Sequence, residues 1–284
     1  MLNYCHSKGV KVIFSIKDAM PGGATNQIQK SWNGISDPIE MSEAAVNRLD
    51  PDHPTYAIYY QFNSYPRYLG CQDIFGIDPY PIKQKTDNDL SSVVQQASHA
   101  VKVQRLAGTG GVALWAAPQY TNPGVWLADG KNDPKIYYEK YRFPTANELR
   151  AMIALEMIYG AKGFIGYSYS SLFYGPDKKQ FENTWPIIQD AVALQRELAP
   201  FILSETVAPE VNVTSIRGTV YAKTFALPEG QIRVLAVSQG LGDFEASLEL
   251  DAGNLKSRYG NIRQKSPGLY EFNGSGICFD MLEP

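Results

Sequence analysis

The sequence contains few residues that carry redox or metal chemistry, with three cysteines and three histidines. Cys5, Cys71 and Cys278 form no CxxC pair, and their number is odd, so the sequence supports neither a disulfide framework nor a zinc site. The three histidines lie far apart along the chain and match no metal-binding motif. The sequence therefore implies no metal and no organic cofactor.

Long apolar segments and a surplus of basic residues are also absent. No run approaches the roughly 20 apolar residues of a membrane-spanning helix, and no charged-then-apolar signal peptide opens the chain. The formal net charge is −3, so the composition has no basic footprint of the kind that nucleic-acid-binding proteins show. We therefore expect neither nucleic acid nor a membrane as a partner, while the localisation stays unknown.

The chain does contain five continuous apolar runs, each of which stops at a polar residue. They are VKVIFSIKD (Val10 to Asp18), TYAIYYQF (Thr55 to Phe62), IFGIDPYP (Ile74 to Pro81), VALWAAPQ (Val112 to Gln119) and GFIGYSY (Gly163 to Tyr169). Runs of this length are typical of strands buried on both faces in a parallel sheet. Helical segments at about 90–106, 145–159 and 184–198 alternate with the later runs, which predicts βα units. Thr145 and Glu148 have the spacing of a capping box, which predicts the start of the second segment.

The pattern of the sequence changes after Ser204. From Val211 onward, short alternating segments rich in β-formers are separated by turn residues, which predicts a small antiparallel β-sandwich. We therefore expect a catalytic-type domain over residues 1–203 and a sandwich over residues 204–284. The chain ends at Pro284, where one more strand of the sandwich would be natural.

Six segments in a fixed order carry a resemblance to a known family. They are HSKGVKVIFSIKD, LDPDHPTYAIYYQ, DIFGIDPYPI, VALWAAPQ, TANELRAMIALEMIYGAKGFIGYSY and LQRELAPFILS. Over most of residues 5–284 the chain resembles bacterial glycoside hydrolase-like (β/α)8 barrels of the broad beta-galactosidase/cellulase type, which carry a C-terminal β-sandwich. The resemblance implies hydrolysis of β-linked oligosaccharides or polysaccharides.

The chain also departs from the pattern of that family. Between Asp18 and Leu49 it lacks the strand with an Asn-Asp-Glu or Asn-Glu pair that supplies the acid/base carboxylate, and the first two barrel strands are absent as well. We therefore expect an α/β fold made of an incomplete TIM-like (β/α) barrel followed by a small antiparallel β-sandwich. The family's acid and nucleophile are not carried over to this sequence.

Glycoside hydrolysis requires two carboxyl groups across a cleft, one as proton donor and the other as nucleophile or base. Asp78 and Asp18 are the catalytic candidates, because each ends a predicted strand and barrel enzymes place their chemistry there. Asp78 shares one face of its strand with Tyr80, which predicts that it points to the barrel axis. The simpler alternatives are that Asp78 caps a turn before Pro79 and that Asp18 caps its loop.

Aromatic and amide side chains near the same strand ends predict a substrate-binding surface. Trp115 and Gln119 share one face of their run, and Tyr167 and Tyr169 share one face of the next. With Tyr80, they would stack a sugar ring on an aromatic floor and bind a hydroxyl group with an amide at its rim. Ordinary core packing is the favoured alternative for Trp115, and a structural role is equally open for Gln119 and Tyr169.

Glu156 is a charged residue within an otherwise apolar helical segment. A buried carboxyl group of this kind can have a raised pKa and act as an acid. More often such a residue finds a lysine or arginine, or extends to water. We therefore interpret Glu156 as structural.

Three functions stay open from the sequence. The first is a glycoside hydrolase, the second is a carbohydrate-binding protein that lacks the acid pair, and the third is a fragment completed by another chain. An opened barrel would leave strand edges unpaired, which invites pairing with a second copy. We therefore expect a homo-oligomer whose contacts cover the edges beside Val10 to Asp18 or Thr55 to Phe62.

Overall fold

A computed structural model describes residues 48, 51–68, 72–83, 88–106, 108, 112–124, 140–173 and 179–284. The chain divides into two units, Met1–His53 and Pro54–Pro284, and all the elements named below belong to the second. The catalytic candidate Asp18, the run that it ends, and the cysteines Cys5 and Cys71 lie outside the described residues.

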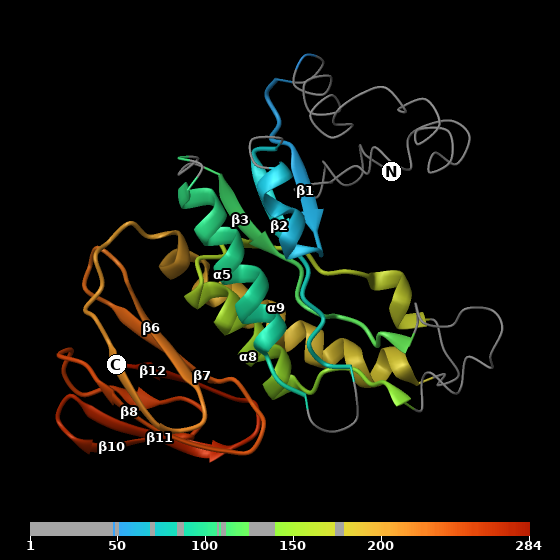
Figure 1. Ribbon diagram of the computed structural model, residues 1–284. Coiled ribbons are helices and arrows are strands. Elements are labelled where there is room, and N and C mark those ends of the chain that lie inside the picture. The colour runs from blue at the N-terminus through green and yellow to red at the C-terminus, as the bar shows by residue number, and fades with distance from the viewer. Residues whose placement is uncertain are drawn as a thin grey trace. The chain divides into compact units, whose positions relative to one another are not determined.

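Four short strands form a parallel sheet in the order β1-β2-β3-β4 (Figure 1). They are β1 (Tyr56–Tyr59), β2 (Ile74–Ile77), β3 (Ala113–Ala116) and β4 (Gly163–Phe164). Each is shorter than the apolar run that predicted it. After β1 the chain turns into the 3-10 helix η1 (Phe62–Tyr68), and after β2 Pro79 and Pro81 cannot donate ladder hydrogen bonds.

Among the described residues, three α-helices follow or separate these strands: α5 (Ser91–Leu106), α8 (Ala146–Ile158) and α9 (Gln180–Leu203). The short 3-10 helix η2 (Tyr169–Phe173) precedes α9. Together with the parallel sheet, they give the second unit a mixed α/β composition, while the barrel geometry stays a prediction. No helix in the described part of the chain combines the length and apolar character needed to span a membrane.

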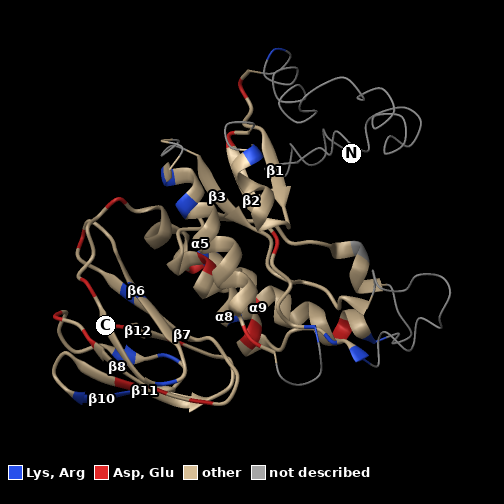
Figure 2. Ribbon diagram, viewed as in Figure 1, with Lys and Arg blue, Asp and Glu red and all other residues tan. Residues whose placement is uncertain are grey.

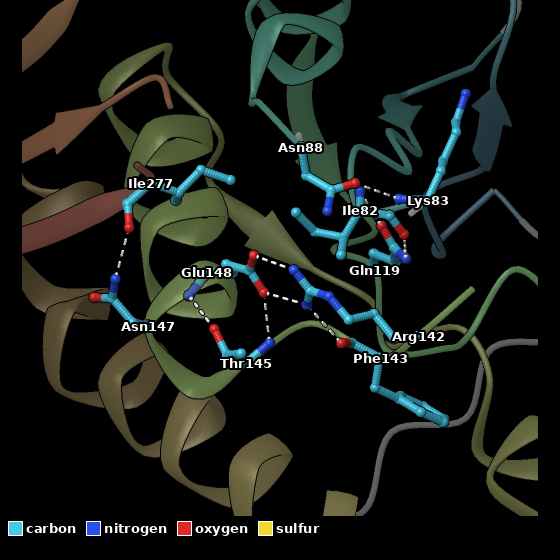
Figure 3. A network of polar contacts seen from close by, with 10 residues as sticks. All are labelled: Ile82, Lys83, Asn88, Gln119, Arg142, Phe143, Thr145, Asn147, Glu148 and Ile277. Atoms are coloured by element: carbon cyan, nitrogen blue, oxygen red, sulfur yellow. Dashed lines mark hydrogen bonds and ion pairs between the residues drawn. The ribbon is translucent and has the colours of Figure 1, made fainter. Parts of the chain in front are cut away.

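The start of α8 confirms the capping box predicted from Thr145 and Glu148. The Thr145 hydroxyl accepts a hydrogen bond from the Glu148 backbone N–H at 3.3 Å, and the Glu148 carboxylate accepts one from the Thr145 N–H at 2.8 Å (Figure 3). Arg142 adds two contacts of 2.6 Å to the same carboxylate, and these contacts lower the pKa of Glu148 despite its burial. The first turn of α8 is therefore stabilised by both a capping box and an ion pair.

The predicted end of α9 near Leu198 is wrong. The helix continues through Pro200 to Leu203, and it also contains Pro186. Phe201 and Ile202 in this extra turn are buried in the hydrophobic core. Burial of these side chains offsets the hydrogen bond that Pro200 cannot donate within the helix.

From residue 212 onward the chain forms two four-stranded antiparallel sheets, ordered β10-β11-β8-β5 and β6-β7-β12-β9. Their strands are β5 (Asn212–Arg217), β6 (Val220–Ala226), β7 (Ile232–Ser238), β8 (Asp243–Glu249), β9 (Lys256–Ser257), β10 (Ile262–Ser266), β11 (Leu269–Ser275) and β12 (Cys278–Glu283). Apolar side chains of both sheets share one core, so the sheets pack face to face. The last residues of the chain, expected to precede a missing strand, instead form β12 between β7 and β9.

A second core joins the helices to the sandwich. Buried side chains of α8 and α9 pack with Leu235 and Val237 of β7 and with Phe279 and Met281 of β12. Arg258 adds contacts of 2.6 Å to both Glu197 of α9 and Glu283 of β12. The domain boundary at residues 203 and 204 stays a prediction, and the residues on both sides of it share this core.

Glu156 lies in the same core, and the expectation that it pairs with a basic residue or reaches water is wrong. Its side chain is fully buried, and neither carboxylate oxygen has a hydrogen-bond partner among the described residues. Burial raises the pKa of Glu156 well above its usual range. Burial therefore favours the neutral, protonated form of this carboxyl group.

Candidate functional site

The register of the parallel sheet aligns one residue from each strand in a row across the sheet. Ile58 pairs with Gly76, Gly76 with Trp115, and Trp115 with Gly163. Because paired residues of neighbouring strands project from the same side of a sheet, this row lies on one face, which we call the outer face. Ile58 is 40% exposed there.

The opposite face of the sheet is buried. Phe75 and Ile77 of β2 have no exposed surface, and Leu114 of β3 is 3% exposed. Phe75 lies 5.0 Å from the ring of Tyr65 in η1, whose ring lies 5.8 Å from that of His99 in α5. This packing fixes which side chains of β2 and β3 project from the outer face.

Two glycines leave room for aromatic rings on the outer face. A Cβ atom at Gly76 would lie 2.7 Å from the Tyr56 hydroxyl oxygen, and one at Gly163 would lie 2.5 Å from the Trp115 ring. The two rings lie 5.8 Å apart between their centroids. Trp115 is therefore a half-buried member of an aromatic floor. Tyr56 belongs to the same floor. Sequence reasoning missed it, because the space for its ring is left by Gly76 on the neighbouring strand, and the pairing of strands is not visible in the sequence.

Asp78 directly follows β2, at the carboxyl edge of the sheet. Its carboxyl group is half-buried, and Oδ1 has no hydrogen-bond partner among the described residues. Burial raises the pKa of Asp78 to about 6, although hydrogen bonds from the Tyr80 hydroxyl and from its own backbone act in the opposite direction. Asp78 can therefore hold a proton in mildly acidic solution and release it near neutrality.

Three tyrosine hydroxyl groups lie close enough to the Asp78 carboxyl to be affected by its charge. Burial raises the pKa of Tyr56, Tyr65 and Tyr80 well above its usual range, and the negative charge of Asp78 raises it further. These hydroxyls therefore stay neutral and can donate hydrogen bonds. The Tyr56 hydroxyl is buried and has no partner within the described residues.

Tyr167 and Tyr169 lie in different surroundings. Tyr167 is 50% exposed, forms a single parallel bridge with Gln119, and raises the pKa of Tyr80 through its charge, so it lies near the Asp78 group. Tyr169 is 60% exposed, and its ring contacts are with Phe173, Phe181 and Trp185 at 5.1 to 6.1 Å. The structure therefore places Tyr167 beside the candidate site and Tyr169 in an aromatic cluster of η2 and α9.

The substrate-binding role of Gln119 stays a prediction, and the contacts of its side chain in the structure are those of a structural residue. The side chain has no exposed surface. Its amide oxygen accepts from the Ile82 N–H at 2.9 Å, and its amide nitrogen donates to the Ile82 carbonyl oxygen at 2.7 Å (Figure 3). The same nitrogen also donates to the Thr121 carbonyl oxygen at 3.2 Å. Both ends of the amide are satisfied by the backbone, so Gln119 joins the loop after β2 to the loop after β3. Parity along the strand could not reveal this, because Ile82 lies 37 residues away in the sequence.

A second carboxyl group beside Asp78 is not found in the described part of the chain, where no carboxyl group contributes to the shifted pKa of Asp78. The same residues contain no group of three or more His, Cys, Asp or Glu side chains that could hold a metal ion. The chemistry visible here is therefore one protonatable carboxyl group with neutral hydroxyl donors and aromatic rings.

Comparison with known proteins gives no sequence match and a weak structural similarity. No family model matches the sequence, and no curated protein sequence matches it significantly. A GH27 β-L-arabinopyranosidase from Geobacillus stearothermophilus is similar in structure with a TM-score of 0.34 and 12% sequence identity, over 78% of this chain. The chain spans about 60% of the length of that enzyme. A likeness at this level does not indicate the activity of this chain, so we base the functional proposal on the site geometry.

Proposed function

We propose that this chain is a glycoside hydrolase of the incomplete (β/α) barrel type, acting on β-linked oligosaccharides or polysaccharides, with Asp78 as its proton donor. The observation that carries the proposal is a half-buried carboxyl group with a pKa of about 6 at the carboxyl edge of a parallel sheet, beside Tyr80. A carboxyl group protonated near pH 6 can protonate the oxygen of a leaving sugar.

The aromatic floor supports a carbohydrate as the substrate class. Tyr56 and Trp115 present ring surface and, in Tyr56, a buried hydroxyl whose hydrogen bonds are not used by the described residues. Sugar rings offer apolar faces and hydroxyl groups together, so they match such a surface. In this proposal Tyr80 and Tyr167 lie at the rim of the site, while Asp18, the other predicted catalytic residue, lies outside the described residues.

One observation favours a second candidate function, which is carbohydrate binding without hydrolysis. Asp78 is the single carboxyl group found at the site within the described residues, whereas hydrolysis requires two. In this case the aromatic floor would bind the sugar, and Asp78 would accept a hydrogen bond from a sugar hydroxyl.

The two functions are separated by measuring turnover and binding on the same variants. The wild-type chain and Asp78→Asn are assayed on a panel of chromogenic β-glycosides, and calorimetry measures their affinity for the corresponding oligosaccharides. Asp243→Asn is the matched control, because its carboxyl group is exposed on the sandwich.

If Asp78 is the proton donor, Asp78→Asn loses turnover by about 100-fold to 10,000-fold and retains binding. Turnover by the wild-type chain then falls as the pH rises through about 6, because the donor loses its proton. Binding without any turnover in the wild-type chain selects the second candidate. Near-wild-type turnover of Asp78→Asn removes Asp78 from the mechanism, and the absence of binding and turnover contradicts both functions.

A further inference from the structure

A hollow of about 490 Å³ lies between α5, the end of α8 and β6. Its lining includes Lys102 and Arg105 of α5, Tyr159 after α8 and Lys223 of β6. We call it the cationic hollow. A neighbouring hollow of about 440 Å³ at the end of α9 shares Lys223 and adds Lys162. Volumes of this size are typical of sites for small organic ligands.

Four basic side chains gather at these hollows without a carboxylate partner. Within the described residues, Lys102, Arg105, Lys162 and Lys223 form no ion pair. Figure 2 shows the two basic positions near the end of α5. Partial burial lowers the pKa of Lys223, and the positive charges of Lys162 and Arg105 lower it further, so these cations are close enough to repel one another.

The negative ends of three helix dipoles compensate part of this positive charge. Lys223 donates to the Ile158 carbonyl at the end of α8, Lys162 donates to the Ile202 carbonyl in α9, and Arg105 is in the last turn of α5. Each helix end provides roughly half a negative charge, so three ends compensate at most about one and a half of the four positive charges. Glu210, which lines the neighbouring hollow, forms no ion pair with another described residue. A surplus of positive charge therefore remains.

The cationic hollow is separate from the candidate site at Asp78. Helices α5 and α8 end shortly before β3 and β4 begin, so their last turns lie toward the amino-terminal edge of the parallel sheet. Asp78 follows the carboxyl end of β2, at the opposite edge. Ligand binding in the cationic hollow is therefore independent of the proposed glycoside hydrolysis at Asp78.

We propose that the cationic hollow binds a small organic anion that carries a phosphate or sulfate group. Lys102, Arg105 and Lys223 would contact the anionic group, because guanidinium and ammonium groups are the preferred partners of such oxyanions. The apolar lining from Val101 and Ile158, with the Tyr159 ring, would cover the organic part of the ligand. An anion there relieves the repulsion among the cations and opposes the lowering of the Lys223 pKa.

Calorimetric titration of the full chain at low salt tests this proposal with four probes. They are inorganic phosphate, inorganic sulfate, a hexose phosphate and the matching neutral hexose. We expect saturable binding of the hexose phosphate, weaker binding of the inorganic anions, no binding of the neutral hexose, and a loss of affinity as salt is added. Tighter binding of sulfate than phosphate would assign the sulfate ester as the ligand class.

Three variants locate the binding. Lys223→Met removes the central charge. The double variant Lys102→Gln/Arg105→Gln changes two exposed side chains and so leaves the core intact, which keeps the test available if Lys223→Met fails to fold. Each should weaken binding of the hexose phosphate by at least about tenfold, the usual loss for a charged hydrogen bond. Arg196→Gln, an exposed position on α9, is the control and should bind like the wild-type chain. No saturable binding, or equal binding by the control and the double variant, would overturn the proposal.

Discussion

Replacement of Glu156 should stabilise the chain in a way that depends on pH. The side chain is fully buried in α8, and both carboxyl oxygens are without a hydrogen-bond partner in the described part of the chain. Burial raises the pKa of Glu156 in the folded state above the ordinary value of 4.5. The folded chain therefore keeps this proton over a pH range in which the unfolded chain has lost it.

The sign of the effect follows from proton linkage. Between the ordinary pKa and the raised pKa, the folded state binds more protons than the unfolded state, so stability falls as the pH rises. The loss is about 1.4 kcal/mol for each pH unit within this window. Below the ordinary pKa the contribution of this titration disappears, because both states are protonated.

Two variants separate titration from desolvation. Glu156→Gln removes the ionisable group and keeps an unpartnered polar group, so its stability relative to the wild-type chain should grow with pH from about 4.5 upward. Glu156→Met also removes the buried polar atoms, and it should gain a further 1 to 3 kcal/mol, about the cost of an unsatisfied buried polar group. Glu249→Gln, an exposed position on β8, is the control.

Urea unfolding followed by tryptophan fluorescence at pH 4.5, 6.0 and 7.5, roughly across the expected window, measures these differences. The difference between the wild-type chain and Glu156→Gln isolates this titration from those of all other groups. Equal pH profiles of these two chains would refute the raised pKa of this buried carboxyl group. A Glu156→Met chain less stable than wild type at pH 7.5 would do the same.

Three further predictions concern packing and assembly. Gln119→Ala should lower the free energy of unfolding by about 1 to 3 kcal/mol, because it leaves backbone groups of Ile82 unsatisfied, and a change in carbohydrate affinity without this loss would contradict the structural role. Gly163→Ala should cost about 1 to 3 kcal/mol, because its Cβ would lie 2.5 Å from the Trp115 ring, and a melting temperature equal to that of the wild-type chain would disprove the clash. β1 pairs only with β2 among the described strands, so we still predict a homo-oligomer, and a clean monomer in sedimentation at micromolar concentration would exclude it.

The sequence by itself determined features that depend on neighbouring residues. Apolar runs located β1, β2 and β3, because a buried strand requires consecutive apolar side chains. The capping box at Thr145 located the start of α8, since its partners are three residues apart. Alternation after Ser204 located strands of the sandwich for the same local reason.

Tertiary structure alone decided the environment of each polar side chain. Glu156 and Gln119 have similar polar side chains, yet one is buried without a partner and the other with its amide fully bonded to distant backbone. The raised pKa of Asp78 and the gathering of cations around Lys223 likewise depend on segments far apart in sequence. Burial and electrostatic fields are sums over neighbours in space, and local periodicity carries no information about which neighbours the fold will supply.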